Sequence, residues 1–436
     1  MAAPVTRNLP YGLDGLAFSA DPRFRWDEVR AGGDSGKGRG TADPVRHALD
    51  HPLGSPRLEV LARDARGPVV IAVPDATRAA RAERVLPRLL RRLEVAGIGV
   101  DRVTVLVATG IHRPATAGEQ RAILGEETAD RCRVVNHCAG DEGEFVTVGH
   151  SSAGTPIRIN RLFAEAGLKI LVGAVGLHYF AGFTGGRKSV LPGLAHRETI
   201  FANHLKVLGG GDGLRHTGVG PARLDGNPVH EEMDEAAALT GVDFIINTIL
   251  DDHGELAGAF AGHWREAHRA ACERVRARQT VPLDGRRPLV LASAGGHPKD
   301  INMIQSHKAM EYAVAALDEG GVLLLAAACP EGPGHPDFFP WFAHRHDVQA
   351  MAQRLRENYV VYGQTALALT AKARRFRVGL ISTMPADTVN AMGLQPLGSL
   401  AEGFDWAAGL LPAGSPAWVI PHAGSLLPVV RGGEEG

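Results

Sequence analysis

The segment 178–193 holds the densest group of residues that could do chemistry. Three glycines surround Thr184 and precede Lys188, between an expected strand and an expected helix. A glycine-rich turn in that position exposes backbone N–H groups to an anion such as a phosphate. The spacing therefore predicts an anion-binding loop that also carries a lysine.

The stretch from Gly182 to Ser189 nearly matches the P-loop pattern G-x-x-x-x-G-K-[ST] of nucleotide-binding enzymes. It departs where Arg187 replaces the glycine before Lys188. That glycine matters because it lets the backbone pass close to the phosphates. On these residues alone, a P-loop-like nucleotide-binding enzyme stays open as an alternative.

Three of the 19 histidines stand out by their positions: His112, His178 and His204. Histidine changes its charge near neutral pH and binds metals through its neutral ring, so each could be a general base or a ligand. Simpler interpretations also stay open. His112 could be a turn residue before Pro114, and His204 could be a histidine on a helix surface.

Two further polar segments could bind a carboxylate. In the first, Asp75 to Arg78, the guanidinium can grip a carboxylate with two N–H groups, although Asp75 could also be a simple helix cap. In the second, Gln305 and Lys308 open a helix after a glycine-rich turn. A solvated charge on the helix surface is the alternative for Lys308.

These side chains follow apolar runs that are typical of buried strands. The runs alternate with segments of helical spacing, which predicts parallel strands covered on both faces. In open α/β sheets ligands bind at the carboxyl ends of the strands. The expected strands are 69–73, 103–108, 133–135, 169–175, 244–250, 289–293, 321–328 and 376–382, with a hairpin over 145–160.

The chain is long enough for two α/β domains with mostly parallel sheets and an active-site cleft between them. We expect an N-terminal cofactor-binding domain over 1–278, a linker over 279–287, and a C-terminal domain over 288–410. The segment 411–436 is expected to return to the N-terminal domain. Residues 31–42 and 431–436 are expected to form a flexible loop and tail.

Composition excludes several classes of protein. The 47 Lys and Arg residues nearly cancel the 48 Asp and Glu residues, so a broad basic field for nucleic acid or an anionic membrane is absent. Four cysteines without a CxxC pair argue against a disulfide or zinc framework. The longest apolar run, 322–329, is too short to cross a bilayer. A cytoplasmic protein is expected.

Taken in order along the chain, these motifs resemble the nickel-pincer lactate racemases and their 2-hydroxy-acid racemase and epimerase relatives. The resemblance rests on the ordered set, and it covers nearly the whole chain. The set is Pro-Asp-Ala-Thr-Arg at 74–78, Ala-Thr-Gly-Ile-His-Arg-Pro at 108–114, Asn-His at 136–137, the segment 178–193, Asn-His at 203–204 and Gln-Ser-His-Lys-Ala at 305–309.

The resemblance implies a nickel-pincer nucleotide, which is a pyridinium-3,5-bisthiocarboxylic acid mononucleotide with a carbon-bound nickel. By carry-over, Lys188 is its covalent attachment point and His204 the nickel ligand. Two sulfurs, one carbon and one imidazole nitrogen suit a square-planar Ni(II). Asp75, Thr184, Gly185 and Gly186 would contact the cofactor, and cofactor-synthesis proteins are implied as partners.

The implied reaction inverts C2 of a 2-hydroxy acid by reversible hydride transfer through a 2-oxo acid. Losing hydride avoids the carbanion that proton removal would leave beside a carboxylate. His112 and His178 would be the catalytic bases for the hydroxyl proton of the two enantiomers. Arg78, Gln305 and Lys308 would hold the substrate carboxylate, gripping the substrate across the domain cleft.

Ile304 departs from the lactate enzymes, in which a polar aromatic residue precedes the glutamine. An aliphatic side chain at this position favours a larger or more apolar substituent, whereas nearby histidines and Lys299 would suit an acidic or sugar-acid substrate.

A second alternative function for the whole chain is a carboxylate-binding sensor that carries no cofactor. The presence of Lys188, His204 and both candidate bases favours the enzyme.

Overall fold

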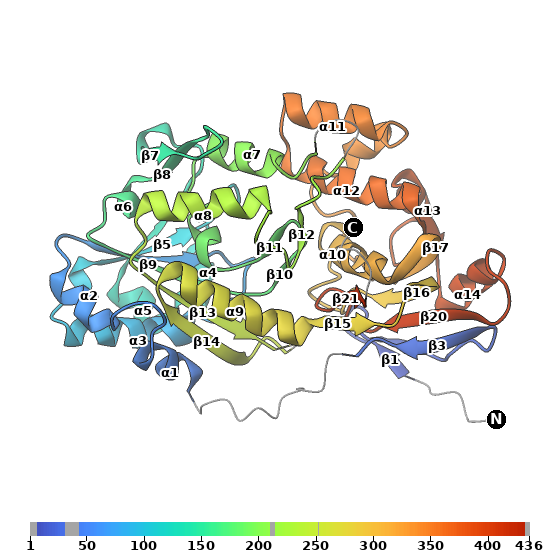
Figure 1. Ribbon diagram of the computed structural model, residues 1–436, viewed down its shortest axis with the longest axis horizontal. Coiled ribbons are helices and arrows are strands. Elements are labelled where there is room, and N and C mark those ends of the chain that lie inside the picture. The colour runs from blue at the N-terminus through green and yellow to red at the C-terminus, as the bar shows by residue number, and fades with distance from the viewer. Residues whose placement is uncertain (1–6, 31–42, 210–213, 252, 432–436) are drawn as a thin grey trace. The chain divides into compact units, whose positions relative to one another are not determined.

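The computed structural model describes residues 7–30, 43–209, 214–251 and 253–431 (Figure 1). The chain forms two compact units. The N-terminal unit comprises residues 34–207 and 218–277. The C-terminal unit comprises residues 1–33, 208–217 and 278–436. Of the expected flexible loop and tail, residues 31–42 and 432–436 lie outside the described residues.

A six-stranded sheet forms the centre of the N-terminal unit, in the order β14-β13-β9-β4-β5-β6. Its strands are parallel except β14, which pairs antiparallel with β13. The bounds are β4 Val69–Pro74, β5 Val103–Ala108, β6 Arg133–Asn136, β9 Leu168–Ala174, β13 Phe244–Leu250 and β14 Leu256–Gly262.

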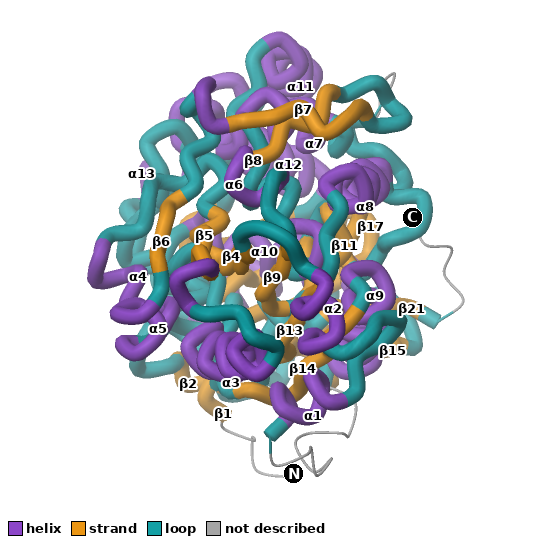
Figure 2. The backbone as a smooth tube through the Cα atoms, turned by 90° about the vertical axis from the view of Figure 1, so that its left-hand side faces the viewer, coloured by secondary structure: helices purple, strands orange, loops and turns teal. Residues whose placement is uncertain are grey.

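Both faces of this sheet are covered by helices. Val69, Ile71 and Val73 of β4 pack on one face with α1, α2 and α3, while Val70 and Ala72 pack on the other with α6 to α9. Figure 2 shows the strands between these two sets of helices. The helices are α1 Pro44–Asp50, α2 Leu58–Asp64, α3 Ala82–Val95, α4 Ala117–Leu124, α5 Glu126–Arg131, α6 Arg161–Ala164, α7 Arg197–Leu205, α8 Pro228–Thr240 and α9 Trp264–Gln279.

The strand order reverses between β4 and β9. From β4 the chain adds β5 and β6 on one side, and it then returns to place β9 on the other side of β4. Ligands of doubly wound sheets bind at such a reversal, beyond the carboxyl ends of the strands. The loops that follow β4, β5 and β9 carry the residues singled out by the sequence.

Two small sheets complete the N-terminal unit. An antiparallel hairpin joins β7 to β8, as expected for 145–160. A three-stranded sheet, β10-β11-β12, begins just after β9 and contains His178. The bounds are β7 Phe145–His150, β8 Pro156–Asn160, β10 Leu177–His178, β11 Ala181–Phe183 and β12 Gly220–Pro221.

The C-terminal unit is built on a second six-stranded sheet, β19-β18-β17-β16-β20-β3, in which every pairing is parallel. The strands are β1 Arg7–Leu9, β2 Leu16–Phe18, β3 Phe24–Glu28, β15 Thr280–Leu283, β16 Arg287–Ser293, β17 Leu317–Ala326, β18 Arg377–Ile381, β19 Gln395–Leu397, β20 Ser415–Ile420 and β21 Leu427–Val430. The helices are α10 Met303–Ala313, α11 Val348–Glu357, α12 Val361–Arg375, α13 Ala386–Ala391 and α14 Leu400–Ala408.

The expected α/β class with mostly parallel sheets is confirmed, but the division of the chain differs from the expected one. The N-terminal strand β3 joins the sheet of the C-terminal unit beside β20, so the segment 1–30 does not belong with 43–207. For the same reason 411–431 stays in the C-terminal unit. Pairing between strands almost 400 residues apart leaves no local signal in the sequence.

A second correction concerns residues 279–287, which were expected to be a linker. They contain β15, which pairs in parallel with β21. Val281 and Leu283 are buried and Pro282 is exposed, so the segment does alternate as a strand should. Pro282 and the turn residues after it obscured this short pattern. Proline is tolerated here because β15 pairs on one side only.

Among the described residues, no helix is both long and apolar enough to cross a membrane.

Candidate active site

Asp75 and His112 form a hydrogen-bonded pair at the ends of β4 and β5. Nδ1 of His112 lies 2.6 Å from Oδ2 of Asp75. Burial would raise the pKa of the Asp75 carboxyl, but hydrogen bonds from His112 and Thr77 outweigh it and hold that pKa below its usual range. An ionised carboxylate only accepts hydrogen bonds, so Nδ1 carries the hydrogen and Nε2 keeps its lone pair. The arrangement gives His112 the form of a general base.

The His112 loop is fixed by backbone contacts. Thr109 donates its hydroxyl to the carbonyl of His137 (2.7 Å), and the N–H of His112 donates to the carbonyl of Thr109. Gly110 donates its N–H to the carbonyl of Gly193 (3.0 Å). This last contact brings the loop after β5 against the end of the lysine-bearing segment.

His178 is held differently from His112. It ends β10, and the backbone N–H of Ala181 donates to its Nδ1 (3.2 Å). In a neutral ring the hydrogen then lies on Nε2, which is 3.5 Å from Nζ of Lys188. A backbone N–H thus orients the ring of His178, whereas a side-chain carboxylate orients that of His112.

Phe180 lies among three of the site residues that the sequence predicted, one candidate base and two candidate cofactor-binding residues. The ring centroids of His178 and His204 are 4.4 Å and 5.2 Å from that of Phe180, and Nζ of Lys188 is 5.3 Å from it. The structure therefore brings His178, Lys188 and His204 around one aromatic ring. Sequence reasoning missed Phe180, although it lies inside the segment that had been singled out.

His204 lies in α7 and is 6% exposed. Burial, followed by the positive charge of Lys188, lowers its pKa to about 3. The imidazole is therefore neutral at physiological pH, which is the form that binds a metal. Among the described residues, no group of three or more His, Cys, Asp or Glu side chains is placed to hold a metal ion.

The glycine-rich loop is packed tightly against β9 and β13. Gly185 and Gly186 have φ angles of 72° and 58°, and a Cβ on Gly185 would lie 2.9 Å from the carbonyl oxygen of Ala174. The N–H of Gly186 donates to Oδ1 of Asn247 (3.0 Å), a buried residue of β13 that sequence reasoning also missed. Only its polar side chain in the middle of the apolar strand β13 could have pointed to Asn247.

Thr184 has a different partner from the one expected. Its hydroxyl donates to the carbonyl of Ala174 and accepts from the N–H of Gly176, both at 2.8 Å. These contacts fix the exit from β9, and the expected contact of Thr184 with a cofactor stays a prediction. The P-loop alternative is not supported either, because Gly186–Ser189 is one turn of 3₁₀ helix and no long α-helix begins there.

Arg78 follows Asp75 in an exposed turn, and its backbone N–H donates to the carbonyl of Asp75 (3.0 Å). Its guanidinium makes no hydrogen bond or ion pair with another residue among those the structure describes. A guanidinium placed this way can bind a carboxylate through two N–H groups.

Gln305 and Lys308 lie one turn apart on α10 of the C-terminal unit. Nζ of Lys308 donates to Oε1 of Gln305 at 2.6 Å. One turn further along, α10 is anchored by Glu311, a buried carboxylate that accepts from Arg215, His307 and Lys372. The helix thus holds the ammonium of Lys308 against the amide of Gln305, whereas Ile304 packs beside Gly334.

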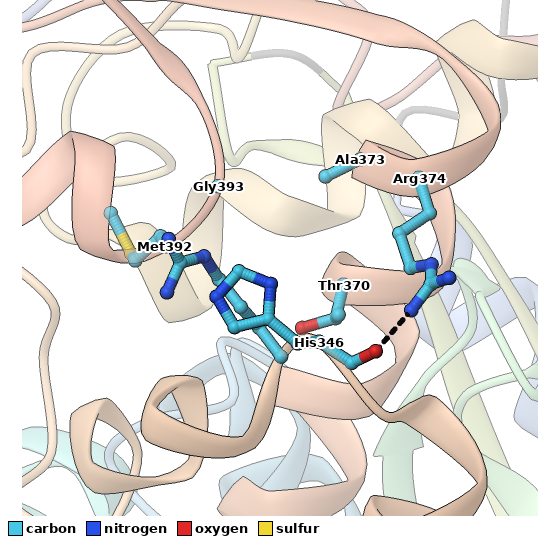
Figure 3. A pocket seen from close by; sticks show the side chains of 7 residues that line it. His346, Thr370, Ala373, Arg374, Met392 and Gly393 are labelled. Carbon is cyan, nitrogen blue, oxygen red and sulfur yellow. Dashed lines mark hydrogen bonds between the residues drawn. The ribbon is translucent and has the colours of Figure 1, made fainter.

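The C-terminal unit contains a cavity of about 200 Å³ (Figure 3). It is lined by Arg345, His346, Thr370, Ala373, Arg374, Met392 and Gly393. Arg374 donates to the backbone carbonyl of His346 across it (2.7 Å). None of the sequence-predicted site residues contributes to this cavity.

Comparisons with known proteins identify the family. Residues 36–212 match the lactate racemase N-terminal domain, and residues 285–427 match the lactate racemase C-terminal domain. The chain belongs to the lactate racemase family. A lactate racemase from Thermoanaerobacterium thermosaccharolyticum is 35% identical over 351 residues, covering 80% of each chain. One from Lactiplantibacillus plantarum is 37% identical over 299 residues, covering 68% of each.

Solved structures agree with this assignment. The lactate racemase apoprotein from T. thermosaccharolyticum superposes with a TM-score of 0.89 at 31% identity, covering 98% of this chain and 100% of that one. A Thermotoga maritima protein, at 18% identity and a TM-score of 0.62, shares the fold over 89% of this chain and 99% of its own. The family membership makes this chain an isomerase of the racemase type.

Proposed function

We propose that this racemase inverts C2 of a 2-hydroxy acid by reversible hydride transfer, using a nickel-pincer nucleotide attached to Lys188. The observation that carries the proposal is that two histidines of the site are each oriented through Nδ1. Asp75 accepts from Nδ1 of His112, and the N–H of Ala181 donates to Nδ1 of His178. A reaction that runs in both directions needs one base and one acid at the substrate hydroxyl.

The residues present fit such a cofactor. Lys188 offers an amine, and His204 offers a neutral imidazole beside the same aromatic ring. A square-planar Ni(II) held by sulfur and carbon atoms of the cofactor needs one further donor, which a single histidine provides. When bound, the group would supply the acceptor and donor of hydride.

The protein's own residues would handle the proton. Nε2 of His112 would take the hydroxyl proton of one enantiomer, and the resulting imidazolium would be stabilised by Asp75. His178 would take it from the other enantiomer through Nε2, in the tautomer that carries the ring hydrogen on Nδ1. In this proposal Asp75 therefore orients and stabilises the base His112. This role is additional to the contact with the cofactor that the sequence predicted for Asp75.

Arg78, Gln305 and Lys308 are proposed as the groups that bind the substrate carboxylate. Arg78 supports this role because its guanidinium is exposed beside the Asp75–His112 pair. The short contact between Lys308 and Gln305 supports the same role for these two residues, because the amide fixes the ammonium group in one position. Binding by fixed groups would orient C2 for reaction.

Lactate is one candidate substrate, since the relatives are named lactate racemases. Ile304 favours a bulkier 2-hydroxy acid over lactate.

The need for cofactor-synthesis proteins as partners and a cytoplasmic location both remain predictions.

Isotope retention tests the proposed chemistry. Enzyme co-expressed with cofactor-synthesis proteins is incubated in ordinary water with one enantiomer of a 2-hydroxy acid that carries deuterium at C2. Hydride transfer predicts inversion with the deuterium retained, as read by chiral chromatography and mass spectrometry. Inversion with loss of deuterium to water would indicate proton abstraction and refute the mechanism.

A further inference from the structure

Arg187, the residue before Lys188, is a completely buried arginine at 0% exposure. It forms no ion pair with any carboxylate among the described residues. Arginine is almost never fully buried without a paired charge. Its side chain must therefore be retained for the hydrogen bonds that it makes.

The guanidinium connects two helices. Nε donates to Nδ1 of His230 in α8 (2.8 Å), and Nη1 lies 3.0 Å from Nε2 of His268 in α9. Burial and the nearby arginine lower the pKa of His230 to about 2 and that of His268 well below its usual value. Both rings are therefore neutral. Nδ1 of His230 accepts from Arg187, whereas Nε2 of His268 donates to the carbonyl of Thr184 in the same loop (3.0 Å).

The same guanidinium also binds the backbone of the lysine-bearing loop. Nη2 donates to the carbonyl of Ala181 (2.8 Å), and Nη1 donates to that of Phe183 (3.1 Å), with the carbonyl of Gly185 at 3.4 Å. One side chain thus joins the loop 181–188 to two helices.

The loop also packs against α9 directly. A Cβ on Gly186 would lie 2.5 Å from the His268 ring, so only glycine fits there. Phe183 belongs to an apolar cluster with Ala271, Cys272 and Val275 of α9. The guanidinium therefore lies in an interface that is already closely packed.

We propose that Arg187 is a positioning residue whose buried guanidinium clamps the loop 181–188 onto α8 and α9 and so holds Lys188 in place for cofactor attachment. The part that concerns attachment rests on the proposed function. A lysine could not replace it, because an ammonium has three donors and lacks the planar fork that reaches both histidines and the loop carbonyls.

Hydrogen exchange of the full-length apoprotein tests the clamp without any cofactor. In Arg187→Met we expect amides in 181–190, such as those of Thr184 and Gly186, to exchange at least tenfold faster, while amides of β4 keep their rates. Arg187→Lys should resemble Arg187→Met, because it keeps the charge but loses the fork. Arg276→Met is the matched control, since Arg276 lies over the Phe183 ring but donates to the carbonyl of Ala222 rather than to the loop 181–188.

Two results would overturn the clamp. One is equal exchange of 181–190 in the Arg187→Met and Arg276→Met proteins. The other is uniform acceleration in the loop and β4 alike, which would mean that Arg187 contributes only to global stability. Should Arg187→Met fail to fold, His230→Leu and His230→Gln replace it. The clamp predicts loop-specific acceleration in the Leu variant and recovery in the Gln variant, which keeps an acceptor, and equal behaviour would refute it.

Loading of Lys188 provides the second measurement. With cofactor-synthesis proteins co-expressed, intact mass spectrometry should show at least a tenfold lower modified fraction for Arg187→Met than for Arg276→Met. Equal loading would refute a role in attachment. If the wild-type chain itself stays unmodified under conditions that load a known lactate racemase, the proposed function fails, and the exchange measurement still decides the clamp.

Discussion

Nδ1 of His112 lies 2.6 Å from Oδ2 of Asp75, and the two residues follow adjacent parallel strands of one sheet. The carboxylate fixes which ring nitrogen carries the hydrogen. Sequence motifs place both residues in the site, but only the structure shows that Asp75 acts on His112.

Asp75→Asn should therefore lower kcat by about 100-fold or more, because an amide can donate to Nδ1 and favour the wrong tautomer. Thr77→Val is the control, since it removes a hydrogen bond to Asp75 but leaves the carboxylate, and we expect less than about a tenfold loss. Steady-state rates from both enantiomers measure the effect. Similar losses in the two variants would argue against a tautomer role.

The two histidines should serve different enantiomers. In single-turnover reactions of the loaded enzyme, His112→Gln should block formation of the 2-oxo acid from one enantiomer and His178→Gln from the other. Each variant should keep the opposite half-reaction at no less than about a tenth of the wild-type rate. Loss of both half-reactions in both variants would contradict separate roles.

Lys308→Ala should raise KM by about 10- to 100-fold, because it removes a charged hydrogen bond to the substrate carboxylate. Gln353→Ala on the exposed face of α11 is the control and should leave KM unchanged. Initial rates against substrate concentration provide the comparison. An unchanged KM for Lys308→Ala would remove this residue from the substrate site.

Acid should destabilise the fold before the carboxylates titrate. Burial lowers the pKa of His137 to about 4, and burial with the charge of Arg187 lowers that of His230 to about 2, against 6.5 for the free side chain. Below about pH 6.5 these two histidines therefore become protonated in the unfolded chain but stay neutral in the folded chain. The free energy of unfolding is therefore unaffected by these histidines above that pH. At pH 5 each of them lowers it by about 2 kcal/mol.

Denaturant unfolding between pH 7.5 and pH 5 measures this loss. His137→Gln should flatten the dependence by about 2 kcal/mol over that interval, whereas His150→Gln at an exposed position should not. A pH profile that is the same in the wild type and in His137→Gln would contradict the assignment.

Glu311→Gln should destabilise the C-terminal unit by about 3–5 kcal/mol, because it leaves the buried charge of Lys372 and the charge of Arg215 without their carboxylate. Glu319→Gln, which loses an exposed pair with Arg375, should cost less than about 1 kcal/mol. Thermal unfolding of both variants tests this difference. Comparable losses would mean that the Glu311 cluster adds nothing beyond a surface ion pair.

Much of the site could be predicted from sequence because its residues follow recognisable strands. The predicted ends of β4, β5 and β9 agree with the observed ends to within about one residue. Asp75, His112 and His178 follow these strands within a few residues. What escaped prediction depends on distant partners. Phe24–Glu28 becomes a strand only by pairing with β20, and Arg187 becomes buried only because His230 and two loop carbonyls accept its N–H groups.

Peptide mass spectrometry with nickel quantification tests the central proposal most directly. Protein co-expressed with cofactor-synthesis proteins should carry an adduct on Lys188 and about one nickel per chain. Lys188→Ala should lose the adduct, and Lys206→Ala, altered just beyond α7, should keep it. His204→Ala should keep the adduct but lose most of the nickel, since His204 is the proposed ligand. An unmodified Lys188 without nickel, where a known lactate racemase loads fully, would contradict the account.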